Sequence, residues 1–121
     1  MQINHKTPRK ELWEILVPTI HRKSGKPIHV RFHRVWDKQV ETLSGGITIM
    51  KPTTTGRWIH KGERIEERMI PVRIICTEPE IDAIVNLTLV YYDQLAVMAY
   101  RISDKVILRN REEYGNYDPH R

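Results

Sequence analysis

Two adjacent glutamates, Glu66 and Glu67, stand just before the apolar segment "MIPVRIICT" at residues 69–77. Successive side chains of a strand point to opposite faces, so the two carboxylates are expected on opposite sides. One can stay in solvent or pair with Arg64 or Arg68. The other can enter a cleft or a subunit seam, where burial would raise its pKa and suit it to acid–base chemistry or to holding an ammonium group. A charge pair that protects a strand edge from aggregation is the alternative.

The stretch "TTTGRW" at residues 53–58 lies a few residues upstream and combines hydroxyl groups, a glycine and a tryptophan. Hydroxyls and flexible backbone N–H groups can hold a phosphate. However, no helix follows, and neither the Walker nor the dinucleotide-binding fingerprint is present. The pair Arg57-Trp58 could stack a nucleic-acid base. A simple turn is the alternative reading of these residues.

Other kinds of catalytic site have little support. His29, His33 and Asp37 are spaced to stack on one side of a continuous helix, but His29 is expected before the helix begins, and we predict no metal site. The single cysteine, Cys76, lies in an apolar strand where a thiol acts as a small hydrophobe. No Gly-x-Ser-x-Gly elbow is present. We therefore predict neither a metal, nor a nucleophile, nor a cofactor.

A hairpin is expected to position the two glutamates. Lys61-Gly62 is a plausible turn between short arms at Arg57–His60 and Glu63–Glu67. The strand that follows, Met69–Thr77, is apolar on both faces and therefore expected to be central. Pro71 near its start is unfavourable in such a strand because proline has no backbone N–H to donate.

The remaining elements complete a familiar order. We predict strands at Leu12–Thr19, Ile47–Met50 and Leu95–Ser103 with a possible short one at Val106–Leu108, and helices from about Phe32 to the "SGG" at 44–46 and from the Thr77–Glu80 capping box to about Asp93. The order β-α-β, hairpin, β-α-β predicts an α+β, ferredoxin-like βαββαβ fold with a hairpin insertion and two helices on one face of an antiparallel sheet. Such a sheet has one bare face, so we expect a homo-oligomer.

The chain has 121 residues, which suits one domain. We predict a flexible basic arm at 1–11, the ferredoxin-like domain at 12–109 and a polar tail at 110–121. No apolar run approaches the roughly 20 residues of a membrane-spanning helix, so no membrane partner is expected. With one cysteine and no secretory signal, a cytoplasmic location is expected.

Positive charge is concentrated in the first third of the chain. Residues 1–34 contain eight Lys/Arg and two Glu, while the rest of the chain has a net charge of −1. A basic segment of this kind fits nucleic acid or a phosphorylated ligand, and it equally fits a solvated arm. A nucleic-acid-binding module is therefore an alternative function.

Several short motifs, taken in order, resemble a known family. They are Thr55-Gly56-Arg57-Trp58, Glu66-Glu67, Val72-Arg73, Tyr92-Asp93-Gln94, and Val97 with Tyr100. Over roughly residues 12–108 this order is similar to the small phage enzymes that degrade S-adenosylmethionine, which are lyases with a trimeric, PII-like ferredoxin fold. It is also similar to an uncharacterised bacterial family in which a Gly-x-Trp turn, a short hairpin and a glutamate precede the same strand-helix-strand.

The resemblance implies an adenosine-type ligand held between the subunits of a trimer. In the lyases the methionine carboxylate displaces methylthioadenosine and forms homoserine lactone, without a metal or cofactor. By position, Glu66 or Glu67 would hold the substrate's amino group. Thr55, Gly56, Arg57 and Trp58 would bind the ligand, and Arg73 would support the structure or a seam. A PII-like protein that sequesters or signals a ligand without catalysis is a further alternative.

Overall fold

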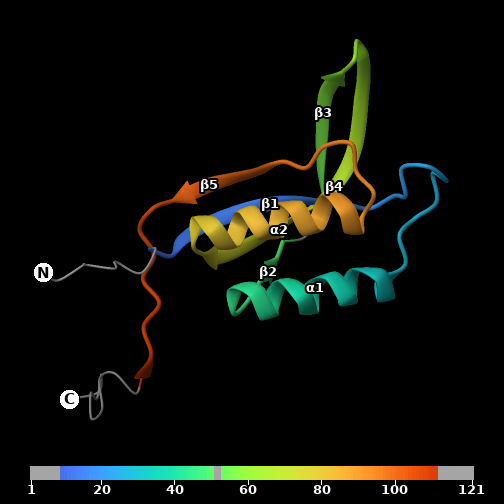
Figure 1. The fold of residues 1–121 in the computed structure, drawn as a ribbon. Helices are drawn as coiled ribbons and strands as arrows, with labels where there is room; N and C mark the ends of the chain where they lie inside the picture. The colour runs from blue at the N-terminus through green and yellow to red at the C-terminus, as the bar shows by residue number, and fades with distance from the viewer. Residues whose placement is uncertain (1–8, 51–52, 112–121) are drawn as a thin grey trace, which may run out of the picture.

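The computed structural model describes residues 9–50 and 53–111, so most of the predicted N-terminal arm and C-terminal tail lies outside the described residues. The elements are β1 (Glu11–Pro18), α1 (Val30–Ser44), β2 (Thr48–Ile49), β3 (Thr54–His60), β4 (Glu63–Cys76), α2 (Glu78–Tyr91) and β5 (Ala99–Ser103). Both helices pack on a five-stranded antiparallel sheet, and the β3–β4 hairpin rises out of the body of the molecule (Figure 1). The predicted α+β, ferredoxin-like fold is confirmed.

The long strand β4 joins the hairpin to the sheet. The strand order is β2-β4-β1-β5, and β3 pairs with the first half of β4. The second arm of the predicted hairpin and the predicted central strand are thus one continuous strand of 14 residues. Residues 67–69 contain neither glycine nor proline, so nothing interrupts the extended backbone between the two parts. The hairpin is therefore a direct continuation of the central sheet.

Pro71 is tolerated in this strand because of where its missing N–H would point. It lies opposite Leu16 of β1, but the Leu16 N–H donates to the Met98 carbonyl at 3.1 Å, on the other side of β1. The Pro71 carbonyl accepts from Met50 N–H at 2.8 Å. The backbone polar groups of Pro71 therefore point away from β1, toward the edge where the partner of β4 changes from β2 to β3. No hydrogen bond between β4 and β1 is lost.

The core lies between the helices and one face of the sheet. Its buried members include Ile15 and Val17 from β1, Val72, Ile74 and Cys76 from β4, and Trp36, Val40, Ile81, Ile84 and Tyr92. The buried Trp36 indole N–H donates to Thr88 Oγ1 at 3.0 Å, and the Thr88 hydroxyl donates to the Ile84 carbonyl. Both polar groups are therefore satisfied inside the apolar core.

Both helix ends follow the local sequence signals. Thr77 and Glu80 form the predicted capping box at the start of α2, and Gly45, with φ of 95°, ends α1. α1 begins at Val30, two residues earlier than predicted, because the His29 side chain caps it by accepting from Arg31 N–H at 3.1 Å. Within the described ranges, neither helix is long and apolar enough to cross a membrane.

The C-terminal strand is shorter than predicted. β5 pairs with β1 from Ser103 opposite Leu12 to Ala99 opposite Ile15, and beyond that point only the Met98 carbonyl bonds to β1. Residues 95–97 belong to no strand, and a continued register would put residue 96 opposite Pro18, which has no N–H to donate. The predicted short strand at Val106–Leu108 is also absent from the described structure, since no neighbouring strand is available to pair with it.

Candidate functional site

The β3–β4 hairpin carries two chemically distinct faces. Its turn, Lys61-Gly62, has positive φ at both residues (51° and 79°), which is the geometry of a tight two-residue hairpin. The pairing Trp58 opposite Ile65 and Arg57 opposite Glu66 then fixes which side chains share a side. One face contains Gly56, Trp58, Ile65, Glu67 and Met69, and the other contains Thr55, Arg57, Ile59, Arg64, Glu66 and Arg68.

Glu67 belongs to the face turned away from the helices. Alternation along β4 puts it on the same side as Met69 and opposite to the core residue Val72. It is half-buried, and burial raises the pKa of its carboxyl above the ordinary value. Among the described residues it has neither an ion-pair nor a hydrogen-bond partner for its side chain. A partly desolvated carboxylate without a cation is suited to receive one from a ligand.

Glu66 lies on the opposite face and is already paired. Its carboxylate accepts from Arg57 Nε at 3.2 Å and lies 4.0 Å from an Arg64 nitrogen, and all three side chains are more than half exposed. Surface pairs of this kind contribute little to stability. The predicted alternation of the two glutamates is therefore present, and the structure distinguishes a paired Glu66 from a Glu67 that has no partner in the described part of the chain.

Gly56 allows a close approach beside Trp58. A Cβ built on Gly56 would meet the Met69 methyl at 2.1 Å and the Trp58 ring at 3.1 Å. A side chain here would displace the end of Met69 and press on the indole. The backbone of Gly56 thus lies close to both the Trp58 ring and the Met69 thioether, where a larger residue would not fit.

Two cavities of about 560 Å³ each flank the hairpin where it meets the body. The first opens toward the loop at 19–25, and the second lies on the open face of the sheet beside Leu16 and Met98. Every predicted site residue lines at least one of the two cavities. Thr55 and Glu66 line the first cavity, and Gly56 and Arg57 line the second. Trp58 and Glu67 line both. Gln94 and Ala96 also line both cavities, so these four residues mark where the two cavities meet.

The loop that walls the first cavity is tied down from two sides. Thr19 Oγ1 donates to the Arg68 carbonyl at 2.9 Å, at the free edge of β4. Arg22 Nε donates to the Asp93 carbonyl at 2.9 Å, and Lys23 lies 3.3 Å from the Asp93 carboxylate. The hydrogen bond from Lys23 and the Arg22 guanidinium lower the pKa of Asp93 despite opposing desolvation. The basic loop is thereby held against the end of α2 and the base of the hairpin.

Known structures show which fold family this arrangement resembles. No protein-family model matches the sequence, and no curated protein does either. The fold is similar to the divalent cation tolerance protein CutA1 of Thermus thermophilus, at 17% identity and a TM-score of 0.57, covering 87% of this chain and 91% of that one. It is also similar to a phage SAM lyase in complex with S-methyl-5′-thioadenosine, at 10% identity and a TM-score of 0.59, covering 86% and 88%.

The fold is likewise similar to CutA1 from Oryza sativa, at 13% identity and a TM-score of 0.53, covering 89% of this chain and 90% of that one. The fold is PII-like. At these identities the likeness concerns the fold alone, and it confirms the resemblance that the short motifs indicated.

The histidines whose spacing raised the question of a metal site have other roles. His29 caps α1, and the His33 ring forms a hydrogen bond of 2.7 Å with the Tyr92 hydroxyl. Burial, with a smaller contribution from His21, lowers the pKa of His33. Across residues 9–50 and 53–111, no three His, Cys, Asp or Glu side chains gather as a metal-binding group. Burial also raises the pKa of the Cys76 thiol to about 12, so this residue is a poor nucleophile.

Sequence reasoning missed a charged network on the open face of the sheet. Glu14 is buried there, accepts from Arg73 Nε at 3.1 Å and receives a hydrogen bond from the Tyr100 hydroxyl. Its signal in the sequence is a glutamate at a strand position between apolar neighbours. Arg73 was expected to support structure or a seam, and it does hold Glu14. Gln94 belongs to one of the motifs noted in the sequence but had no predicted role in the site, and Ala96 had no signal, because only the path of the chain after α2 brings them to the two cavities.

Proposed function

We propose that this chain binds an adenosine-type small molecule at the base of the hairpin, with S-adenosylmethionine as its most specific candidate ligand. The observation behind the proposal is that Trp58 and Glu67 share one hairpin face and line both cavities. One residue offers an aromatic surface and the other an unpaired, partly desolvated carboxylate. A ligand with a flat heterocycle and a positively charged end matches this pair.

The surroundings of the pair fit the two ends of such a ligand. Beside Trp58, the second cavity is walled by Leu16, Met69 and Met98, which present apolar and polarizable surface to an adenine ring. Beside Glu67, the first cavity contains Arg22 and Arg68, whose guanidinium groups can receive a carboxylate. An α-amino acid end would then lie with its ammonium on Glu67 and its carboxylate toward these arginines.

The chemistry we propose is an intramolecular displacement. The substrate's own carboxylate oxygen attacks the methionine carbon bonded to sulfur, the C–S bond breaks, and the sulfonium leaves as neutral methylthioadenosine with homoserine lactone as the second product. No proton has to move in this step. Glu67 would act by fixing the ammonium group, so that the carboxylate reaches the carbon in a reactive geometry, and catalysis would come from positioning and electrostatics.

A trimer would complete the site, with one subunit's open sheet face closing the cavities of the next. The helices cover only one face of the sheet, and Met98, Tyr100 and Ile102 on or beside the other are exposed apolar residues. Contact with a second subunit would bury these residues and exclude water from Glu67. We place this assembly in the cytoplasm, where a single reduced cysteine is stable.

Incubation of the pure protein with S-adenosylmethionine, followed by chromatography for methylthioadenosine, tests the proposal. Glu67→Gln removes a charge-assisted hydrogen bond, so ligand affinity should fall by about 10- to 100-fold, and turnover with it. The matched variant Glu66→Gln, which changes a paired residue on the other face, should stay within about threefold of wild type. A thermal shift without product would support the ligand-sequestering alternative. The absence of both product and thermal shift would refute the proposed site.

A further inference from the structure

The second face of the hairpin has a different character from the first. Arg57, Arg64 and Arg68 share it with a single acidic residue, Glu66. Alternation along β4 puts this arginine face on the same side of the sheet as Val72, which is the side covered by the helices. It therefore points away from the side on which Trp58 and Glu67 lie.

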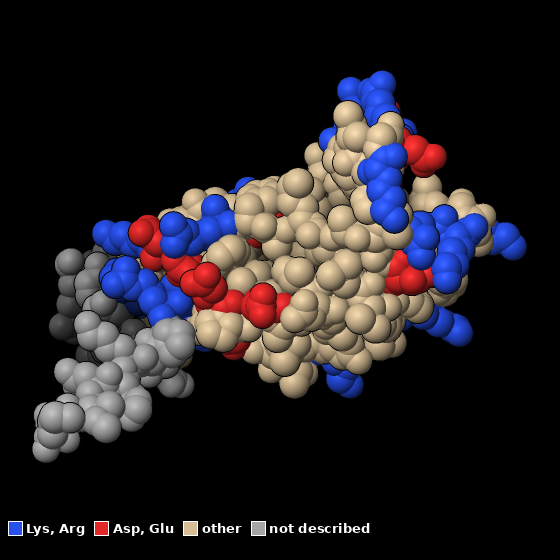
Figure 2. Space-filling model, turned by 45° about the horizontal axis from the view of Figure 1, so that its top comes forward, with Lys and Arg blue, Asp and Glu red and all other residues tan. Residues whose placement is uncertain are grey.

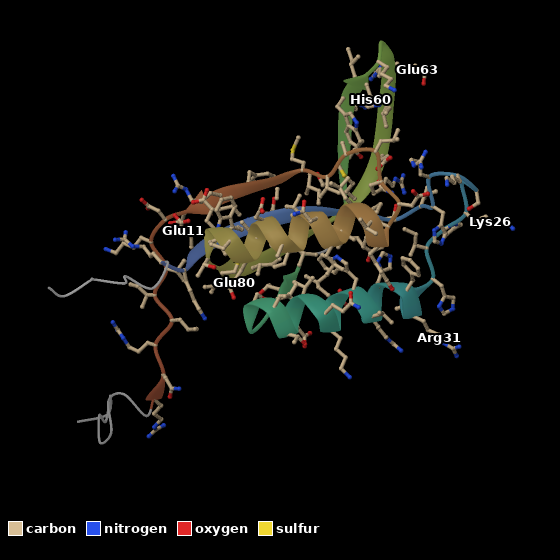
Figure 3. The ribbon with its side chains drawn as sticks, in the orientation of Figure 1. Glu11, Lys26, Arg31, His60, Glu63 and Glu80 are labelled. Carbon is tan, nitrogen blue, oxygen red and sulfur yellow. The ribbon has the colours of Figure 1, made fainter. Side chains whose placement is uncertain are left out.

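The basic part of the first third of the chain is brought to the same end of the molecule. Residues 19–34 contain five Lys/Arg and no acidic residue, and the loop within them is tied to the hairpin through Thr19 and Arg68. Lys26 and Arg31 lie at the end of the body from which the hairpin rises, whereas Glu11 and Glu80 lie toward the opposite end (Figure 3). Two segments that are distant in sequence thus form one basic end.

The charge of this basic end accounts for the charge of the protein. Residues 19–34 and 54–68 together contain nine Lys/Arg and three Glu, a net charge of +6, and Asp93, which pairs with Arg22 and Lys23, reduces it to +5, the net charge of the whole chain. Figure 2 shows Lys and Arg over the hairpin and over the neighbouring loop, with few acidic side chains between them. The side chains of Lys26, Lys61 and Arg68 have no ion-pair partner among the described residues.

The start of α1 adds to this positive field. Its first turn contains no acidic residue, Arg31 lies in that turn, where the helix dipole is already positive, and Arg34 follows in the next turn. That placement is unfavourable for the helix alone and favourable beside an anion. Together with the arginine face, it presents a wide surface of cations rather than a pocket for one ion.

We infer that this basic end binds the phosphate backbone of a nucleic acid, at a surface that borders the ligand cavities at Arg57 and Arg68 and extends beyond them over Lys26, Lys61 and Arg64. A projecting two-stranded ribbon with arginines on one face has the shape that enters a nucleic-acid groove, while the loop at 19–29 and the start of α1 lie where flanking phosphates would pass. The contacts named here are all to phosphate, so the binding is sequence-independent.

Fluorescence anisotropy with a labelled single-stranded 20-mer and with the matching duplex tests this inference. If three cations each contact a phosphate, raising the salt about fourfold, from about 50 to 200 mM, should weaken single-strand binding about 20-fold. The variant Lys26→Gln/Lys61→Gln/Arg68→Gln should lose most of this affinity and of its salt dependence. The ratio of single-strand to duplex affinity shows which form the ribbon accepts.

The variant Lys10→Gln/Lys38→Gln/Lys105→Gln is the matched control, because it loses the same charge away from the basic end. It should bind within about threefold of wild type, and Glu67→Gln should not bind more weakly. Equal losses in both triple variants, or no binding at the lower salt, would overturn the inference. Binding to vesicles of anionic phospholipid with no binding to either oligonucleotide would overturn it in favour of a membrane surface.

Discussion

At the scale of single residues, the two adjacent glutamates differ through their partners. Glu67 is half-buried and has no cationic partner within residues 9–50 and 53–111. Burial raises the pKa of its carboxyl in the folded protein, so the folded state holds the proton more tightly than the unfolded chain. Stability from this group is then fully present below the ordinary carboxyl pKa and is lost as the pH rises through the raised value. Glu67→Gln should therefore melt at a higher temperature than wild type at pH 7, with the difference vanishing below about pH 4.

Thermal unfolding followed by circular dichroism across this pH range measures the effect. Glu66→Gln serves as the control, and its melting temperature should change little at any pH because its exposed pair with Arg57 contributes little. A Glu67→Gln protein that melts below wild type at pH 7 would show that the carboxylate has a stabilising partner, contrary to the geometry described above.

At the scale of elements, the capping box of α2 is the local feature with the clearest energetic role. Thr77 Oγ1 accepts from Glu80 N–H at 3.3 Å, and Glu80 Oε1 accepts from Thr77 N–H at 2.8 Å. Thr77→Ala should lower the free energy of unfolding by about 1 kcal/mol, measured by urea denaturation. Thr42→Ala, on the exposed side of α1 where the hydroxyl only returns to the Lys38 carbonyl, should change it by less than about 0.5 kcal/mol. Equal losses would contradict a specific role for the cap.

These elements also show how far the sequence could be interpreted. The cap at Thr77, the glycine end of α1 at Gly45 and the turn at Lys61 are set by neighbours within four residues, and all were predictable. The alternation of Glu66 and Glu67 was predictable too, but not which of them faces away from the helices. That depends on the pairing of β4 with β1, whose residues are more than 50 positions away.

The same limit applies to the cavities. The hydrogen bond between Arg22 and Asp93 spans 71 residues, and Gln94 lines the same cavity as Trp58 only because of the path of the chain after α2. No local pattern encodes such contacts. The basic first third was visible as composition, whereas its meeting with the arginine face of the hairpin follows only from the fold.

At the scale of the whole molecule, the two helices cover one face of the sheet and leave the other open. Met98 is 57% exposed on this face and borders the second cavity, so an arginine there would place an unpaired charge in any seam formed by the sheets. We expect light scattering to give three times the 14.4 kDa of one chain for wild type, and a single chain's mass for Met98→Arg. Val90→Arg, at an 82% exposed position on α2, should remain assembled.

Ligand binding should follow the assembly if the neighbouring subunit closes the cavities. Met98→Arg would then lose the thermal shift with S-adenosylmethionine together with its oligomeric state, while Val90→Arg would keep both. Oligonucleotide binding by the basic end needs only one subunit, so its affinity per chain should survive in Met98→Arg. A wild-type protein that has the mass of a single chain at micromolar concentration, yet still binds the ligand, would show that the cavities of one subunit suffice and would remove the trimer from the proposed mechanism.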